Sequence, residues 1–203
     1  MSHGSGDAPP APPAMPRPSG PYRTARLVLR PFTADDLDAF LEMHGDPEVT
    51  RYVPYPPMTR QQAAERLERI ATWTAIDDQE QNLRLAVELP ESGEVIGDMS
   101  MWTMAHDRLT GEIGFVVNPS VQGRGYASEA AGELLRIGFE EAGLHRITAN
   151  CDARNSPSYR VMERIGMRRE AHFRQSSYEK GEWVDELVYA ILADEWRTRN
   201  ATE

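Results

Sequence analysis

The most constraining feature of this sequence is a glycine-rich turn, residues 118–128, that lies between an apolar strand-like run and an alanine-rich helical run. Gly123 and Gly125 allow the backbone to turn tightly and to approach a ligand closely. The helix that follows directs its first unpaired N–H groups, and the positive end of its dipole, toward this glycine turn. The segment therefore predicts an anion site, and a phosphate group is the natural occupant of such a site.

Spacing separates the phosphate-binding motifs that include such a turn. A P-loop ends in Gly-Lys-Ser/Thr, but the only lysine of this chain, Lys180, lies far downstream. The dinucleotide motif needs a third glycine where this chain has Ser128, and an acidic residue about twenty positions later at the end of the next strand. The acids at that distance, Glu140 and Glu141, fall inside the predicted helix. The P-loop is excluded, and a nucleotide-dependent oxidoreductase is kept only as a distant alternative.

A third motif, Gln/Arg-x-x-Gly-x-Gly/Ala, is present at Gln122, Gly125 and Ala127. It resembles the acyl-CoA pyrophosphate loop of the GCN5-related N-acetyltransferase (GNAT) superfamily. Further segments in the family's order are similar to its branch of ribosomal-protein alanine N-acetyltransferases. These segments are the strand-like runs 24–30 and 111–117, the Asn-x-x-Ser sequence from Asn155 to Ser158 with Gly166 and Met167 after it, and the closing run 181–196.

The resemblance implies an α/β (α+β) fold with a mixed, largely antiparallel seven-stranded sheet. Helices flank this sheet, and it splays apart between two parallel central strands. The sequence pattern agrees, because the helical run after the glycine turn crosses back to a strand and so makes 111–117 and 146–152 parallel. The expected strands are 26–30, 83–89, 94–102, 111–117, 146–152, 168–178 and 182–192. The expected helices are 33–44, 59–74, 126–142 and 156–166.

The resemblance also implies the co-substrate, acetyl-CoA, and the residues that bind it. Its pantetheine arm is expected between the two parallel strands, along the backbone of Phe115, Val116 and Val117, with a further bond from Asn155. The pyrophosphate is expected on the glycine turn. The matching residues there are Gln122, Gly123, Arg124, Gly125, Tyr126, Ala127 and Ser128.

Acetyl transfer to an amine needs a neutral amine, a stabilised oxyanion and a proton for the departing thiolate. A backbone N–H of the 111–117 strand can hold the oxyanion. The superfamily often donates this proton from a tyrosine, but that position is Met162 here. The resemblance implies Ser158 for this role, because it matches the serine of the same branch, and its expected part is a hydrogen bond to the thiolate rather than full proton donation; Tyr159 is the reserve candidate. Glu112, beside the expected co-substrate, is the predicted base, acting directly or through water. Asp185 and His106 are weaker alternatives for this role.

Residues 1–22 hold seven of the fifteen prolines and few apolar side chains, so a disordered tail is expected before a single domain over 23–199. No apolar run is long enough for a signal peptide or a membrane span, which predicts a cytoplasmic protein without a membrane partner. The net charge of −10 argues against nucleic acid and suits a cationic amine.

The remaining residue types add little chemistry. The single cysteine, Cys151, excludes an internal disulfide and is expected to be a buried thiol rather than a nucleophile. The five histidines lack ligand spacing, so no metal is expected. The acceptor is expected to be a protein N-terminal α-amino group or a small-molecule amine, contacted by Tyr52 and Tyr55 and by the 177–183 hairpin. A non-catalytic acyl-CoA sensor is the alternative, and both a monomer and a homodimer fit the sequence.

Overall fold

The computed structural model of the chain describes residues 21–76, 81–103 and 109–201. In these residues nine strands form one sheet, in the order β1-β2-β4-β5-β6-β7-β9-β8, with β3 paired to β4. The strands are β1 (Tyr22–Arg23), β2 (Val28–Arg30), β3 (Thr74–Ile76), β4 (Gln81–Leu89), β5 (Glu94–Thr103), β6 (Thr110–Val117), β7 (Arg146–Asp152), β8 (Arg168–Glu179) and β9 (Glu182–Leu192). The helices are α1 (Leu37–Gly45), α2 (Arg60–Ile70), α3 (Tyr126–Arg136), α4 (Ser156–Arg164) and α5 (Ala193–Asn200), with short helical turns η1 (Ala34–Asp36), η2 (Thr50–Tyr52), η3 (Pro119–Val121) and η4 (Ile137–Glu141).

The expected fold class is confirmed, because the sheet is mixed and β6 and β7 form its parallel pair while the other described pairs are antiparallel. The expected number of seven strands is too small. The two additional strands, β1 and β3, are two and three residues long, which is too short to produce a recognisable alternation in the sequence. Tyr22, expected in the tail, begins β1. Residues 1–20 of the expected tail lie outside the described residues.

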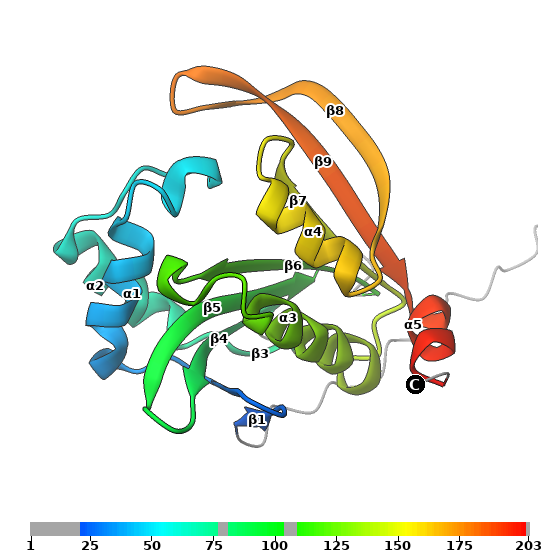
Figure 1. The fold of residues 1–203 in the computed structure, drawn as a ribbon, viewed down its shortest axis with the longest axis horizontal. Helices are drawn as coiled ribbons and strands as arrows, with labels where there is room; N and C mark the ends of the chain where they lie inside the picture. The colour runs from blue at the N-terminus through cyan, green and yellow to red at the C-terminus, as the bar shows by residue number, and fades with distance from the viewer. Residues whose placement is uncertain (1–20, 77–80, 104–108, 202–203) are drawn as a thin grey trace, which may run out of the picture.

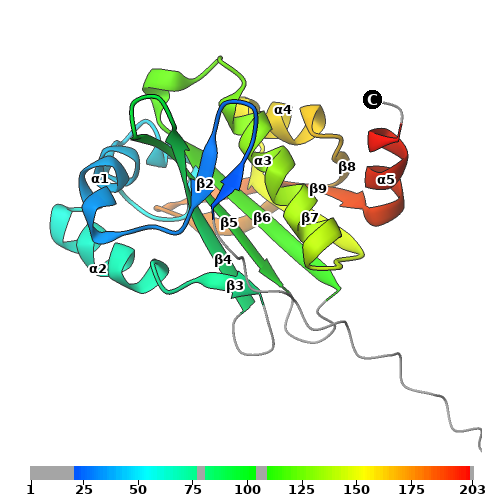
Figure 2. The ribbon, with the colours of Figure 1, turned by 90° about the horizontal axis from the view of Figure 1, so that it is seen from below.

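Helices cover both faces of the sheet, with α1 and α2 on one face and α3 on the other (Figures 1 and 2). The alternation of β4 explains the two cores, since successive strand side chains point to opposite faces. Leu85 and Val87 pack in the core that contains the apolar side of α3. Ala86, between them, packs against α1 and α2.

Local signals set the helix boundaries. Thr59 caps α2 by accepting the Gln62 N–H at 3.3 Å, as its position predicts. That helix ends at Ile70, so Thr74, expected on the helix, lies in β3 instead. The helix after the glycine turn continues from α3 through the wider turn η4 and stops before Gly143, whose φ of +64° ends it as expected.

The β8–β9 hairpin extends away from the rest of the sheet (Figure 1). Its tip is held by Lys180, whose Nζ donates to the carbonyls of Thr50 and Arg51 at 2.8 and 2.6 Å. These contacts join the hairpin to η2, so two segments far apart in the sequence meet over the same face. In the part of the chain that the structure describes, no helix has the length and apolar character of a membrane span.

Candidate active site

The two parallel strands separate after a short ladder. Residues 110–112 of β6 pair with 146–148 of β7, although β6 continues to Val117 and β7 continues to Asp152. After Glu112, the edge of β6 that faces β7 is therefore no longer paired with β7. The splay that the sequence predicted begins at this residue.

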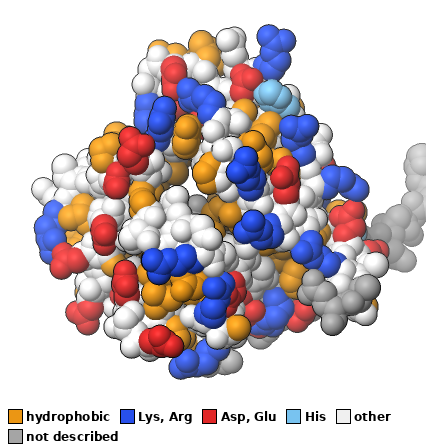
Figure 3. Space-filling view, viewed as in Figure 1, with side chains coloured by type: hydrophobic (Ala, Val, Ile, Leu, Met, Phe, Trp, Pro, Cys, Tyr) orange, Lys and Arg blue, Asp and Glu red, His pale blue; other side chains and the backbone are white. Residues whose placement is uncertain are grey.

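Two cavities meet at the splay. The α2 cavity, of about 490 Å³, reaches from β6 to Arg66 of α2 and Trp73. The α3 cavity, of about 470 Å³, reaches from β6 to the glycine turn and α4. Six residues line both cavities: Tyr52, Val53, Phe115, Val116, Asn155 and Ser158. The space-filling view shows the surface hollowed near the centre of this face, with basic side chains on the α4 side (Figure 3).

The glycine turn forms the far end of the α3 cavity. Gly123 and Gly125 have φ values of +78° and +84°, which a residue with a side chain rarely adopts. Gly125 is the N-cap residue of α3 and has no side chain to cap the helix, so the first N–H groups of α3 are left to a ligand. The Ser128 hydroxyl is buried and has no hydrogen-bond partner among the described residues. The turn therefore offers several unused donors to one point of the cavity.

Contacts from the start of the domain hold this turn in place. Arg26 donates from Nη1 to the Arg124 carbonyl at 3.0 Å and from Nε to the Glu129 carboxylate at 2.7 Å. Its guanidinium also lies 4.6 Å from the ring centroid of Tyr126. The backbone of the turn and the first turn of α3 are thereby fixed to one another. Arg124, expected to hold the pyrophosphate as part of this loop and its N–H groups, is not among the residues that line either cavity.

Helix α4 places its first turn at the junction of the cavities. Asn155 caps the helix by accepting the Ser158 N–H at 3.2 Å, which fixes Ser158 in that turn. Arg160 and Arg164, one turn apart, line the α3 cavity. The sequence analysis missed these two arginines, although their spacing of four residues puts them on one side of a helix.

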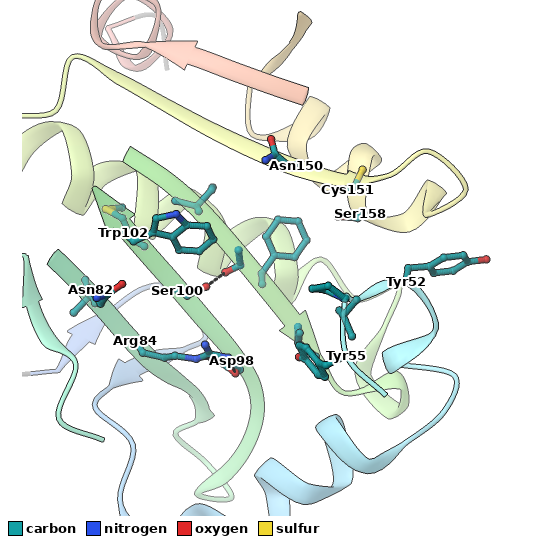
Figure 4. A pocket seen from close by; sticks show the side chains of 18 of the residues that line it. Tyr52, Tyr55, Asn82, Arg84, Asp98, Ser100, Trp102, Asn150, Cys151 and Ser158 are labelled. Atoms are coloured by element: carbon teal, nitrogen blue, oxygen red, sulfur yellow. Dashed lines mark hydrogen bonds and ion pairs between the residues drawn. The ribbon is translucent and has the colours of Figure 1, made fainter. Parts of the chain in front are cut away.

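The single thiol lies beside the predicted proton donor, as Figure 4 shows for Cys151 and Ser158. Burial raises the pKa of Cys151 to about 11; Asp152 adds to the rise and a hydrogen bond with Ser158 opposes it. A thiol with this pKa stays protonated at neutral pH and is a poor nucleophile. The expected full burial is wrong, since Cys151 is only partly buried and lines the α2 cavity, but the raised pKa fits the inert role that was predicted.

Glu112 occupies the last rung of the parallel ladder. Its Oε1 accepts a hydrogen bond from Asn150 Nδ2 at 3.2 Å, and Asn150 lines the α2 cavity while Glu112 itself lines neither cavity. Burial raises the pKa of Glu112 to about 6, with Glu186 adding to the rise. The carboxyl group is therefore one side chain away from the cavity wall and has a pKa near neutrality.

The reserve candidates lie elsewhere. Tyr159 packs against the core on the α3 face, and Asp185 accepts from His172 Nε2 and the Gln175 N–H on the exposed hairpin. His106 lies outside the described residues. Of the residues expected to contact the acceptor, Tyr52 and Tyr55 do line the α2 cavity. No residue of the 177–183 hairpin lines either cavity, and Lys180 joins this hairpin to the carbonyl of Thr50, two residues before Tyr52.

A buried polar network that the sequence analysis missed forms the floor of the α2 cavity. Arg84 donates to the two oxygens of Asp98 at 2.8 and 2.5 Å, and His44 Nε2 lies 2.8 Å from the same carboxylate. Burial disfavours the charge of Asp98, yet Arg84 and His44 hold its pKa well below its usual range. In the tautomer that donates to Asp98, His44 Nδ1 accepts from the Tyr55 hydroxyl at 2.9 Å.

Comparison with known proteins adds the family. A family model described as an acetyltransferase (GNAT) domain matches residues 26–168. The chain belongs to the GNAT acetyltransferase family. This GNAT enzyme is 40% identical over 173 residues to the uncharacterized N-acetyltransferase YnaD of Bacillus subtilis, which covers 85% of this chain and 97% of YnaD.

Solved structures agree. A GNAT-family acetyltransferase from Bacillus anthracis is 36% identical, with a TM-score of 0.76 over 86% of this chain and 99% of its own. The RimJ protein of Mycobacterium smegmatis, solved in complex with CoA-disulfide, is 27% identical, with a TM-score of 0.73 over 87% of each chain. The predicted family, its likeness to ribosomal-protein acetyltransferases and the enzyme class are confirmed. Acetyl-CoA is the acyl donor that this family uses.

The GNAT fold brings most of the predicted binding residues together. The α3 cavity is lined by Phe115, Val116, Val117, Gln122, Gly123, Gly125, Tyr126, Ala127, Ser128, Asn155 and Ser158. Among the described residues, no group of three or more histidine, cysteine or acidic side chains could hold a metal ion.

Proposed function

We propose that this GNAT enzyme transfers an acetyl group from acetyl-CoA to a primary amine where its two cavities meet. The observation that carries the proposal is the splay after Glu112, which opens the edge of β6 directly between the two cavities. An extended pantetheine arm matches such an edge, because its amides can use those N–H and C=O groups of 115–117 that point away from β5. The amine then enters from the α2 cavity.

The residues of the α3 cavity fit the diphosphate of acetyl-CoA. The uncapped N–H groups at the start of α3 and the unpartnered Ser128 hydroxyl are donors without an acceptor among the described residues. A diphosphate supplies the acceptors, and the helix dipole favours its charge. Arg160 and Arg164 add positive charge on the opposite wall.

The chemistry of transfer assigns three roles. The amine nitrogen attacks the thioester carbonyl, the N–C bond forms, the C–S bond breaks, and one proton leaves the nitrogen while another reaches the thiolate. Glu112 takes the first proton through water, because Glu112 lines neither cavity and Asn150, which donates to its Oε1, lies on the wall of the α2 cavity. Ser158, which lines both cavities, donates a hydrogen bond to the thiolate. A backbone N–H of β6 stabilises the oxyanion.

The acceptor that we propose first is a protein N-terminal α-amino group, since the chain is similar to the ribosomal protein uS5-alanine N-acetyltransferase of Escherichia coli. A small-molecule amine is the second candidate. It is favoured by the aromatic walls of the α2 cavity, Tyr52, Trp73 and Trp102, and by a volume of about 490 Å³, typical of small-ligand sites. Cytoplasmic location and the monomeric or homodimeric state stay predictions.

Calorimetric titration with acetyl-CoA, with NADH as the control, tests the first step. We expect saturable binding of acetyl-CoA and no response to NADH, and an absence of acetyl-CoA binding contradicts the proposal. Thiol release with a panel of amines then separates an enzyme from a non-catalytic sensor, which binds acetyl-CoA but releases no thiol with any amine.

The role of Ser158 is tested with Ser158→Ala and the matched control Ser156→Ala, two residues earlier on the same helix and outside both cavities. We expect Ser158→Ala to lower kcat roughly tenfold or more, the value of one hydrogen bond to a charged group. Affinity for acetyl-CoA should stay unchanged in both variants. An equal kcat in the two variants removes Ser158 from the mechanism.

A further inference from the structure

We infer that the amine acceptor carries an oxyanion, a carboxylate or phosphate group, which Arg66 and Arg84 bind at the α2 end of the α2 cavity. This inference rests on the proposed transfer to an amine and names the chemical class of the acceptor. It follows from a cationic excess in a cavity whose other charges are already paired.

Arg66 is the source of this excess. It lines the α2 cavity, and its Nε is buried without a hydrogen-bond partner in the described part of the chain. Its guanidinium lies 4.7 Å from the ring centroid of Tyr55, which holds the planar group in place. No carboxylate of the described residues forms an ion pair with it. A half-buried guanidinium in this state lacks the acceptor that its geometry is suited to bind.

Arg84 supplies the second half of the site. Arg84 donates from Nε and Nη2 to the carboxylate of Asp98. Its Nη1 is left to donate to another acceptor in the α2 cavity, which Arg84 lines. The charges of Arg84 and Asp98 cancel, so the charge of Arg66 is left over. Burial and the nearby charge of Arg84 lower the pKa of Arg66. An anion placed between the two guanidinium groups relieves this repulsion.

The contrast with other arginines supports a binding role. Several arginines outside the α2 cavity have a carboxylate partner within 3 Å: Arg26 with Glu129, Arg30 with Asp36, Arg60 with Asp38, Arg136 with Glu141, Arg146 with Glu170 and Arg154 with Asp152. Arg66 stays unpaired in a chain whose net charge is −10. The overall charge suggested a cationic acceptor, whereas the cavity itself selects an anionic group on that acceptor.

The anion end of the cavity is continuous with the point of transfer. Asp98 lies opposite Val116 in the β5–β6 ladder, and Val116 lines both cavities. An acceptor held by Arg66 and Arg84 can therefore extend its amine toward the splayed edge of β6.

Matched acceptors that differ only in charge test the inference. One arm compares glycine, β-alanine and γ-aminobutyrate with their carboxamides, and also with aminoalkyl phosphates. The other compares short peptides with a free N-terminus and glutamate or glutamine at the second position. We expect the acidic member of at least one pair to have a kcat/KM roughly tenfold or more above its neutral partner, as one charged hydrogen bond provides. The arm that responds identifies the source of the oxyanion.

Two variants assign the preference to the cavity. Arg66→Gln should lower kcat/KM for the acidic acceptor roughly 10- to 100-fold and leave the neutral partner nearly unchanged. Arg60→Gln, on the same helix but paired with Asp38 outside the cavity, should keep the full preference. If Arg66→Gln does not fold, Arg66→Lys decides, because it keeps the charge and loses the planar fork.

The outcomes separate this inference from the proposed function. Equal rates for acidic and neutral partners in both arms overturn it while transfer to amines stands. A preference that survives undiminished in the Arg66 variants also overturns it. If no amine is acetylated, the proposed function fails, and calorimetry of the same acid and amide pairs with the wild type and Arg66→Gln decides the anion site alone.

Discussion

Glu112 is the residue whose chemistry depends most on its surroundings. Burial, followed by the charge of Glu186, raises its pKa to about 6. Both causes disfavour the carboxylate, so the group becomes a stronger base than an exposed glutamate while it stays mostly ionised at neutral pH. The position at the end of the parallel ladder therefore tunes this side chain for proton removal.

A pH profile checks this role. Below about pH 6 the carboxyl group is protonated and cannot accept a proton, so transfer should fall about tenfold per pH unit relative to the Glu112→Gln variant. The ratio of wild-type to variant kcat/KM removes the ionisation of the amine itself. Glu186→Gln should move the inflection to lower pH, because it removes the like charge. A ratio that does not change between pH 5 and 8 contradicts the assignment.

At the residue scale, features formed within one segment were predictable from the sequence, whereas contacts between distant segments were not. Asn155 and Ser158 form a local cap and were predictable from their spacing. The network of His44, Arg84 and Asp98 joins α1, β4 and β5, and its contacts depend on strand register. The signal was a pair of opposite charges, Arg84 and Asp98, inside two largely apolar strands expected to be neighbours.

At the scale of the element, the backbone conformation of the glycine turn determines both the shape of the turn and the direction of the N–H groups that form the anion site. Gly125 combines a φ of +84° with the N-cap position of α3. A methyl group there strains the backbone by roughly 1 kcal/mol or more and tilts the N–H groups that follow. The conformation is therefore a condition for the anion site.

Gly125→Ala should weaken acetyl-CoA binding roughly tenfold or more, since several charge-assisted hydrogen bonds lose their alignment. The matched control is Gly181→Ala in the β8–β9 hairpin, where φ is +91° and an added Cβ meets no atom within 4 Å. Both variants should lose similar stability in thermal unfolding, but only Gly125→Ala should lose affinity in calorimetry. Equal affinities would mean that the turn does not bind the co-substrate.

Elements with a strong hydrophobic period, or with a glycine at the end of a helix, were predictable from the sequence. The helix after the glycine turn was expected and begins at Tyr126. Its last turn, η4, widens to a π-type turn before Gly143, a change that follows from packing and not from sequence period. Strands β1 and β3 were missed because tertiary pairing, and not intrinsic preference, makes such short segments extended.

At the scale of the whole molecule, the tip of the β8–β9 hairpin is joined to a segment beside the two cavities. Lys180 joins its tip to the carbonyls of Thr50 and Arg51, and Tyr52 beside them lines both cavities. The parts of the acceptor site are thus assembled from segments near residues 50, 84 and 180. The sequence predicted that η2 and the hairpin lie near the acceptor, but the bridge itself needed the structure.

Lys180→Met removes this bridge. We expect a KM for the acceptor roughly tenfold higher, the value of one charged hydrogen bond, with unchanged acetyl-CoA affinity. The acceptor KM of Lys180→Arg, which keeps a cationic donor, should lie between that of the wild type and that of Lys180→Met. Hydrogen exchange of residues 46–58 should become faster in Lys180→Met, and an unchanged KM together with unchanged exchange rules the bridge out as part of the site.

The lysine of this bridge also concerns which side chains of the enzyme could be acetylated by its own reaction. The chain has one lysine and twenty-one arginines, and a guanidinium keeps its proton at any physiological pH and so offers no nucleophilic nitrogen to a thioester. The one ε-amino group is occupied by two carbonyls. Nearly all the positive charge of the protein is therefore carried by arginines, which acetyl transfer does not neutralise. The ion pairs that stabilise the fold keep their charges while the enzyme transfers acetyl groups.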